Sequence, residues 1–183
     1  LTVTIAQAGK LQYKTYVASP DGFEVVSTIL YGEKDAVLVD AQFTLSDAHR
    51  LVATLLETKR NLTTIYVTHS HPDHYWGLEV VKQAFPKAKV YARPEVIKAI
   101  KGEMAAKVKT WKPLYGANVT SKPIVPQPLK GNTITLENET LEISAVTQGD
   151  SEPNTYVYVP SLNAIITGDK AFLKRMWPVV RSS

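Results

Sequence analysis

The sequence contains no cysteine, which excludes both disulfides and thiolate metal ligands. It also lacks an apolar run of membrane-spanning length and a recognisable signal peptide, so we expect no membrane partner. Neither sign of charge dominates, with 21 basic and 17 acidic residues. The lysine-richest stretch, residues 98–112, is interpreted as a solvated helix face, so we expect no nucleic-acid partner. The compartment stays open between an exported (periplasmic or secreted) protein and a cytoplasmic one.

Histidine is scarce as well, and its distribution is uneven. The chain has four histidines, three of which share a short segment with an aspartate. The residues of this segment are His69, His71, Asp73 and His74. A β-branched and aromatic run at 62–67 precedes them and predicts a buried strand, while helical apolar spacing at 75–85 follows. So many potential ligands in one strand-to-helix loop predict a metal site rather than packing or solvated surface.

The spacing within this loop predicts two adjacent sites. His69 and His71 are two positions apart in an extended segment and can point the same way. Pro72 stiffens the turn and directs Asp73 and His74 towards a second point. Imidazole and carboxylate ligands suit zinc, with manganese or iron as alternatives.

The remaining pattern alternates strands and helices in a chain whose length fits one domain, residues 1–183. Strands are predicted at 2–6, 12–18, 23–31, 35–40, 62–67, 88–92, 133–137, 140–146, 155–160 and 163–167. Helices are predicted at 44–59, at 75–85 and from Pro94. The turn Glu137-Asn138-Glu139 suits a hairpin. Four prolines between 112 and 128 predict a long irregular loop.

The pattern His69-x-His71-x-Asp73-His74, with Gly77 shortly after it, resembles the signature of the metallo-β-lactamase superfamily. The resemblance extends from about Thr28 to Asp169, and it implies an α/β fold of the αββα type. In such a fold two sheets pack face to face between layers of helices. Asp40, at the end of a predicted strand, resembles the early aspartate that supports the metal loop in this family.

The resemblance also implies roles for further residues. Asp169 would bridge two metal ions, and Asp150 occupies the place of a histidine that normally binds the first metal. Asp73 resembles the residue that orients the attacking hydroxide and passes a proton to the leaving group. Tyr75 and Trp76 directly follow the motif, and they either line the substrate pocket or pack in the core.

The chain ends about fourteen residues after Asp169, and no histidine follows His74. The last histidine ligand of the family is therefore absent. We expect a sandwich that is incomplete in its C-terminal half, with an exposed sheet face or edge. A second copy of the chain would cover it most simply, which predicts a homodimer.

Two functions follow from these residues. The first is a zinc-dependent hydrolase that uses a metal-bound hydroxide on an ester, lactone, thioester or amide, with esters and lactones ranked above β-lactams. The second is a degenerate family member that serves as a metal-binding or structural module without catalysis. Asp150 and the missing final histidine favour the second.

Overall fold

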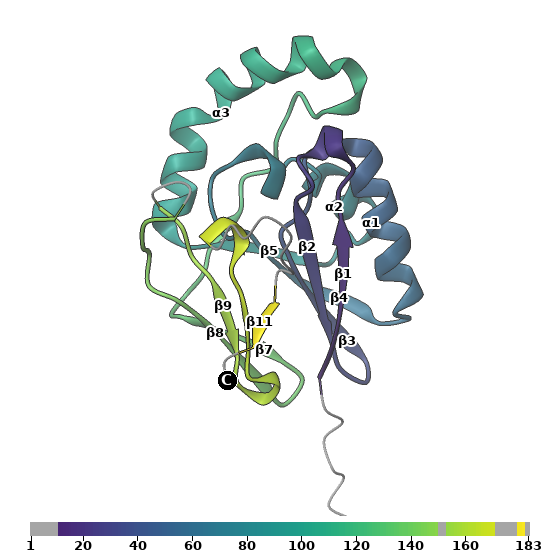
Figure 1. Cartoon of the computed structure of the whole chain (residues 1–183), viewed down its shortest axis with the longest axis vertical. Coiled ribbons are helices and arrows are strands. Elements are labelled where there is room, and N and C mark those ends of the chain that lie inside the picture. The colour runs from purple at the N-terminus through teal and green to yellow at the C-terminus, as the bar shows by residue number, and fades with distance from the viewer. Residues whose placement is uncertain (1–10, 150–152, 171–178, 182–183) are drawn as a thin grey trace, which may run out of the picture.

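The protein folds into two β-sheets and three α-helices in the computed structural model, which describes residues 11–149, 153–170 and 179–181 (Figure 1). The first sheet has the strand order β1 (Gln12–Val17), β2 (Val26–Tyr31), β3 (Asp35–Val39), β4 (Asn61–Tyr66), β5 (Lys89–Ala92) and β6 (Gln127–Pro128). Strands β1 to β3 are antiparallel, and β3 to β6 are parallel. The parallel strands end at one edge of the sheet, which is where the candidate site lies.

The second sheet is antiparallel throughout. Its strands are β11 (Val179–Arg181), β10 (Ala164–Ile166), β9 (Val157–Val159), β8 (Glu139–Ile143) and β7 (Thr133–Leu136), in that spatial order. The predicted hairpin joins β7 to β8, and Glu137 takes the left-handed conformation (φ 56°) that such a tight turn requires. The alternation of buried and exposed residues along β7 and β8 means that one face of this sheet packs inward.

The three helices are α1 (Leu45–Glu57), α2 (Leu78–Ala84) and α3 (Pro94–Tyr115). All three contribute buried residues to the apolar cluster that also contains one face of the first sheet. A second cluster combines the opposite face of that sheet with the inner face of the second sheet. The described residues therefore form three layers, helix–sheet–sheet, of the four in an αββα sandwich. The mixed α/β class predicted from the sequence is confirmed.

Helix α1 begins with a capping arrangement that also holds the β1–β2 turn. Thr44 Oγ1 accepts a hydrogen bond from the Asp47 backbone N–H at 3.1 Å. The Asp47 carboxylate is fully buried and accepts hydrogen bonds from Tyr16 Oη at 2.7 Å and Ser19 Oγ at 2.8 Å. Arg50 adds an ion pair at 3.2 Å. One carboxylate thus joins the first strand, the following turn and the first helix.

Several element boundaries differ from those predicted. Helix α3 continues through Pro113 to Tyr115, where an irregular loop was expected from 112, because the aromatic residues of its last turn pack onto the core. Strand β2 begins at Val26 rather than 23 because Phe23 and Glu24 both have positive φ. The strand predicted at 2–6 lies outside the described residues.

Short 3-10 turns connect several elements: Pro20–Gly22, Pro72–His74, Gly116–Asn118, Pro160–Leu162 and Gly168–Lys170. The second of them occupies the predicted ligand loop, so α2 starts only at Leu78 rather than at 75. Within the described part of the chain, no helix is long and apolar enough to cross a membrane.

Candidate metal centre

The loop between β4 and α2 carries four of the predicted ligands. His69 and His74 are buried, with exposed fractions of 0% and 1%, whereas His71 and Asp73 are partly exposed. Pro72 starts the short 3-10 turn and His74 ends it, which changes the chain direction between the first pair of ligands and the second. The two imidazoles of His69 and His74 still converge, with ring centroids 4.0 Å apart.

Asp40 fixes the loop from the end of the neighbouring strand β3. Its carboxylate accepts hydrogen bonds from the Thr68 backbone N–H at 2.9 Å and from Thr68 Oγ1 at 2.8 Å. The same group lies 2.7 Å from His74 Nδ1. Asp40 is 1% exposed and has a φ of 61°, a strained conformation that recurs at functional sites. A proton on His74 Nδ1 directed at this carboxylate leaves Nε2 of the ring as a ligand atom.

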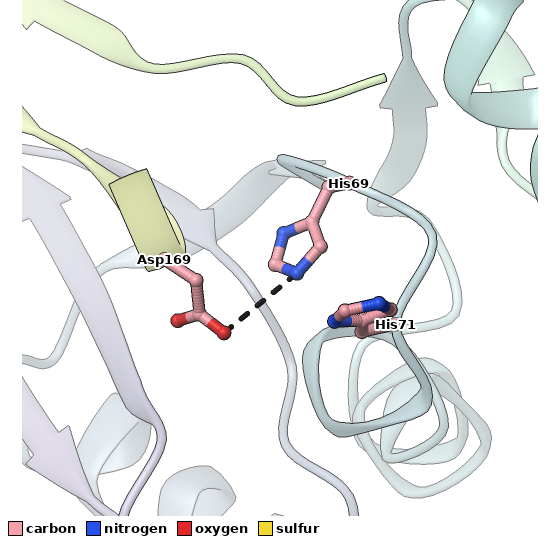
Figure 2. A group of neighbouring side chains, drawn as sticks. All are labelled: His69, His71 and Asp169. Atoms are coloured by element: carbon pink, nitrogen blue, oxygen red, sulfur yellow. Dashed lines mark ion pairs between the residues drawn. The ribbon is translucent and has the colours of Figure 1, made fainter. Parts of the chain in front are cut away.

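Asp169 reaches the same place from the second sheet, just after β10 (Figure 2). Its Oδ2 atom lies 3.2 Å from His74 Nε2 and 3.8 Å from His69 Nε2. Gly168 has a φ of 53°, and a Cβ there would lie 2.7 Å from Thr68 Oγ1. The close approach of the two sheets at this point therefore depends on glycine.

The convergence produces two groups of three potential ligands that share Asp169. One group is His69, His71 and Asp169, and the other is Asp73, His74 and Asp169. Within each group the ligand atoms lie within 4.8 Å of one another. Figure 2 shows the first group, with two imidazoles from one loop facing a carboxylate from the other sheet. The structure thus brings together five of the six residues predicted as ligands, in the pairs that the loop spacing predicted.

Burial and charge act in opposite directions on the two buried histidines. Burial lowers the pKa of His69 below its usual value, and the neighbouring histidines and Lys107 lower it further. Burial also lowers the pKa of His74, but the carboxylates of Asp40, Asp73 and Asp169 together raise it well above its usual value. His69 is therefore neutral at physiological pH and has a lone pair available for a ligand.

The carboxylates respond to the same environment. Burial raises the pKa of Asp73, with the nearby charge of Asp169 adding to the effect. Burial acts in the same direction on Asp169, but the hydrogen bond and charge of His74 lower its pKa below the usual value. Two carboxylates in so confined a space favour a bound cation, since unpaired negative charge away from water is costly.

The residues fit a divalent cation. His69 Nε2 is fully buried and has no hydrogen-bond partner among the described residues, and the nearest carboxylate oxygen, Asp169 Oδ2, lies 3.8 Å away. An orphaned buried nitrogen is costly unless another partner takes its lone pair. The donor set of imidazole nitrogens and carboxylate oxygens is one that zinc, manganese and iron accept.

The other predicted site residues have different positions. Asp150 lies outside the described residues, so its place at the first site stays a prediction. Tyr75 and Trp76 are fully buried in the core, and the Trp76 ring stacks on Phe43 with centroids 5.3 Å apart. Of the two positions expected for these rings, the structure therefore shows packing in the core, and neither ring is exposed to a pocket.

Two residues near the centre, Thr155 and Lys107, carry no signal in the sequence. The Thr155 hydroxyl donates to the Thr68 carbonyl at 2.7 Å and lies 2.9 Å from Tyr66 Oη. These bonds tie the segment just before β9 to the first residue of the ligand loop. Lys107 of α3 donates to the Ser70 carbonyl at 3.1 Å, inside the loop. All of these contacts join segments distant in sequence, so residue spacing does not predict them.

Comparison with known proteins identifies the family. The family model described as "Metallo-beta-lactamase superfamily" matches residues 20–179. The chain belongs to this superfamily, whose members are mostly hydrolases.

Relatives of known sequence match over a shorter segment. Two hydroxyacylglutathione hydrolases of Actinobacillus pleuropneumoniae, from serotype 5b (strain L20) and serotype 3 (strain JL03), are each 34% identical to this chain over 64 residues. That segment is 35% of this chain and 26% of the relatives, so the match spans about a quarter of their length.

Solved structures support the fold over most of the chain. The BLEG-1 B3 metallo-beta-lactamase aligns with a TM-score of 0.67 at 22% identity, covering 89% of this chain and 74% of that one. A metallo-beta-lactamase family protein from Thermus thermophilus has a TM-score of 0.65 at 22% identity, covering 92% and 62%. The FEZ-1 metallo-beta-lactamase from Legionella gormanii has a TM-score of 0.60 at 17% identity, covering 89% and 58%.

Proposed function

We propose that this chain is a zinc-dependent hydrolase of small esters, lactones, thioesters or amides. The observation that carries the proposal is that two ligand groups share the carboxylate of Asp169. A shared carboxylate between two adjacent sites suits a pair of metal ions that act on one substrate. Membership of a superfamily made up mostly of hydrolases supports the same reaction class.

Each ligand has a definite position in the proposal. His69 and His71 would hold the first metal, Asp73 and His74 the second, and Asp169 would bridge them. When bound, zinc supplies a strong Lewis acid and lowers the pKa of a coordinated water to about 7. Asp150 is proposed as a further ligand of the first metal.

Asp73 is the residue proposed to move a proton. Its Oδ2 atom lies 3.5 Å from His74 Nε2, and the side chain is 16% exposed, so it is accessible from solvent while mostly shielded. Because burial raises the pKa of this carboxyl, it accepts a proton more readily than an exposed aspartate does. It would hold that proton on a carboxylate oxygen and deliver it to the leaving group.

The proposal names one reaction, hydrolysis, but several classes of substrate, which we rank. Esters and lactones come first, because the bridging position carries an aspartate. Thioesters belong in the same panel, because the matched segment is similar to hydroxyacylglutathione hydrolases. β-Lactams follow, since the likeness to metallo-beta-lactamase structures lies below 25% identity and shows the fold alone.

The test combines metal analysis with a substrate screen. Purified protein loaded with zinc is expected to hold two metal ions per chain by elemental analysis and to hydrolyse at least one class in the panel. His71→Ala is expected to lower the metal content sharply, whereas His49→Ala, on the exposed face of α1, leaves it unchanged. Tight binding of at most one ion, or no hydrolysis by the fully loaded protein, would support the alternative of a non-catalytic metal-binding or structural module.

A further inference from the structure

Lys107 places a cationic group beside the candidate metal loop from a different part of the fold. It lies in the second half of α3, and its ammonium donates to the Ser70 carbonyl at 3.1 Å. Ser70 separates His69 from His71, so the ammonium reaches the chain between the two histidines of the first ligand group. The lysine side chain is only 20% exposed, and its charge contributes to the lowered pKa of His69.

The partners of Lys107 leave it able to accept another ligand. An ammonium has three donors, and the described contacts use two of them, one to Ser70 and one to Glu103 Oε2 at 2.5 Å. Glu103 precedes Lys107 by one helical turn and is 48% exposed. Because the Glu103 side chain is about half exposed, it can turn into solvent, and a carboxylate from another molecule can replace it on Lys107 with little loss.

The other lysines of this helix region do not share these features. Lys109 is exposed, and Lys112 donates to the Val119 carbonyl at 2.6 Å, beyond the end of α3. Among the described lysines of α3, Lys107 is the one that reaches the ligand loop. A cation next to a cationic metal centre does not help to hold the metal, since like charges repel. Its charge is therefore better suited to an anionic group of the molecule that the metal centre acts on.

We infer that Lys107 forms an anion subsite that binds a carboxylate of the substrate while the reacting carbonyl lies at the metal centre. This inference rests on the proposed function and narrows it to substrates with a free carboxylate. The contact with Ser70 keeps the ammonium beside the centre, and Glu103 occupies the subsite until the substrate carboxylate takes its place. Lys107 is thus a specificity-determining residue outside the ligand loop.

The test uses two thiols that differ only in their far end, 3-mercaptopropionate and 3-mercaptopropan-1-ol. Both bind cobalt(II) through sulfur, and cobalt-loaded protein reports that bond by a sulfur-to-cobalt absorption band. The measured quantity is the ratio of the two dissociation constants, which removes the contribution of the metal–sulfur bond. We expect the wild type to prefer the carboxylate thiol and Lys107→Gln to reduce that preference about two- to fivefold, the range that the loss of one ion pair near the surface gives.

Four variants separate charge from structure. Lys107→Gln keeps a donor for the Ser70 carbonyl but loses the charge, and Lys107→Arg keeps the charge. Lys109→Gln is the matched control on the same helix and should leave the ratio at the wild-type value. Glu103→Gln removes the competing carboxylate, and we expect it to increase the preference for the anionic thiol.

Each outcome has a defined meaning. A ratio that is the same in wild type and Lys107→Gln, with the cobalt band present, overturns the anion subsite and leaves the proposed function intact. Equal weakening of both thiols shows that Lys107 only ties α3 to the loop, which also overturns the inference. If elemental analysis shows that the wild-type protein retains no cobalt(II), the metal centre is removed, and with it both proposals.

Discussion

Asp40→Asn is the substitution that tests most directly how the fold builds the centre. Asp40 binds no metal in our proposal, yet its carboxylate contacts the Thr68 N–H at 2.9 Å, Thr68 Oγ1 at 2.8 Å and His74 Nδ1 at 2.7 Å. Asparagine has the same shape, but it replaces one acceptor oxygen with an NH₂ group. That group would face a hydrogen-bond donor inside a site where Asp40 is 1% exposed.

The size of the effect follows from these contacts. Loss of an outer carboxylate that orients a histidine ligand typically weakens metal binding about 10–100-fold, or about 1.4–2.7 kcal/mol. Removing one partner from a buried charged pair lowers the free energy of unfolding by about 3–5 kcal/mol. We therefore expect zinc affinity and stability to fall together in Asp40→Asn.

The assay needs a control that loses stability alone. Zinc affinity is measured by competition with a chromogenic chelator, and stability by urea unfolding of the metal-free protein. Asp47→Asn is the matched variant, because Asp47 is also a fully buried carboxylate but its hydrogen-bond partners lie on β1, the following turn and α1. If the folded Asp40→Asn variant binds zinc as tightly as the wild type, the view that Asp40 orients His74 is refuted.

Three further predictions concern the surroundings of the centre. Gly168→Ala should lower the free energy of unfolding by about 1–3 kcal/mol and weaken zinc binding, because φ is 53° and the new Cβ would lie 2.7 Å from Thr68 Oγ1. Zinc binding as tight as in the wild type, measured by the same chelator competition, would contradict this. Trp76→Ala should cost about 3–5 kcal/mol in urea unfolding, because the ring is fully buried, whereas a pocket-lining role would instead reduce turnover with little change in stability. Asp47 should stabilise the protein most at neutral pH: burial alone raises the pKa of its carboxyl, but hydrogen bonds from Thr44, Tyr16 and Ser19 lower it below the usual value. The stability difference between wild type and Asp47→Asn should accordingly be constant above about pH 5 and shrink as the pH falls below the unfolded value of about 3.9; a difference that grows towards acid pH would refute the assignment.

The parts of the fold that follow from local sequence were predictable. Strand β4 is a short β-branched and aromatic run, helix α1 carries apolar residues at the helical period, and the ligand loop combines four potential metal ligands in six positions. Asp169 was predicted from the family resemblance, and the structure brings it to the same centre. Apart from Asp169, these features depend on residue types and spacing within one short segment, which a sequence displays directly.

The features that could not be predicted depend on contacts between distant segments. An irregular loop was expected from residue 112, but α3 continues to Tyr115, whose ring packs against Phe43 with centroids 4.9 Å apart, and this tertiary contact outweighs the local preference. For Trp76 the sequence left a pocket-lining position and core packing open, and the short turn and α2 direct the ring into the core. Lys107 lies 37 positions from Ser70, and nothing in its neighbourhood marks it as different from the other lysines.

The origin of the ligands in two separate sheets has a consequence for folding. His74 and Asp169 are 95 positions apart, so a metal ion held by both would close a loop of about that length. A covalent cross-link over roughly 100 residues stabilises a protein by about 4.7 kcal/mol, because it restricts the unfolded chain. In a chain without cysteine, the ion would thus act as the removable counterpart of a disulfide, and metal supply would govern how firmly the two halves of the sandwich stay together.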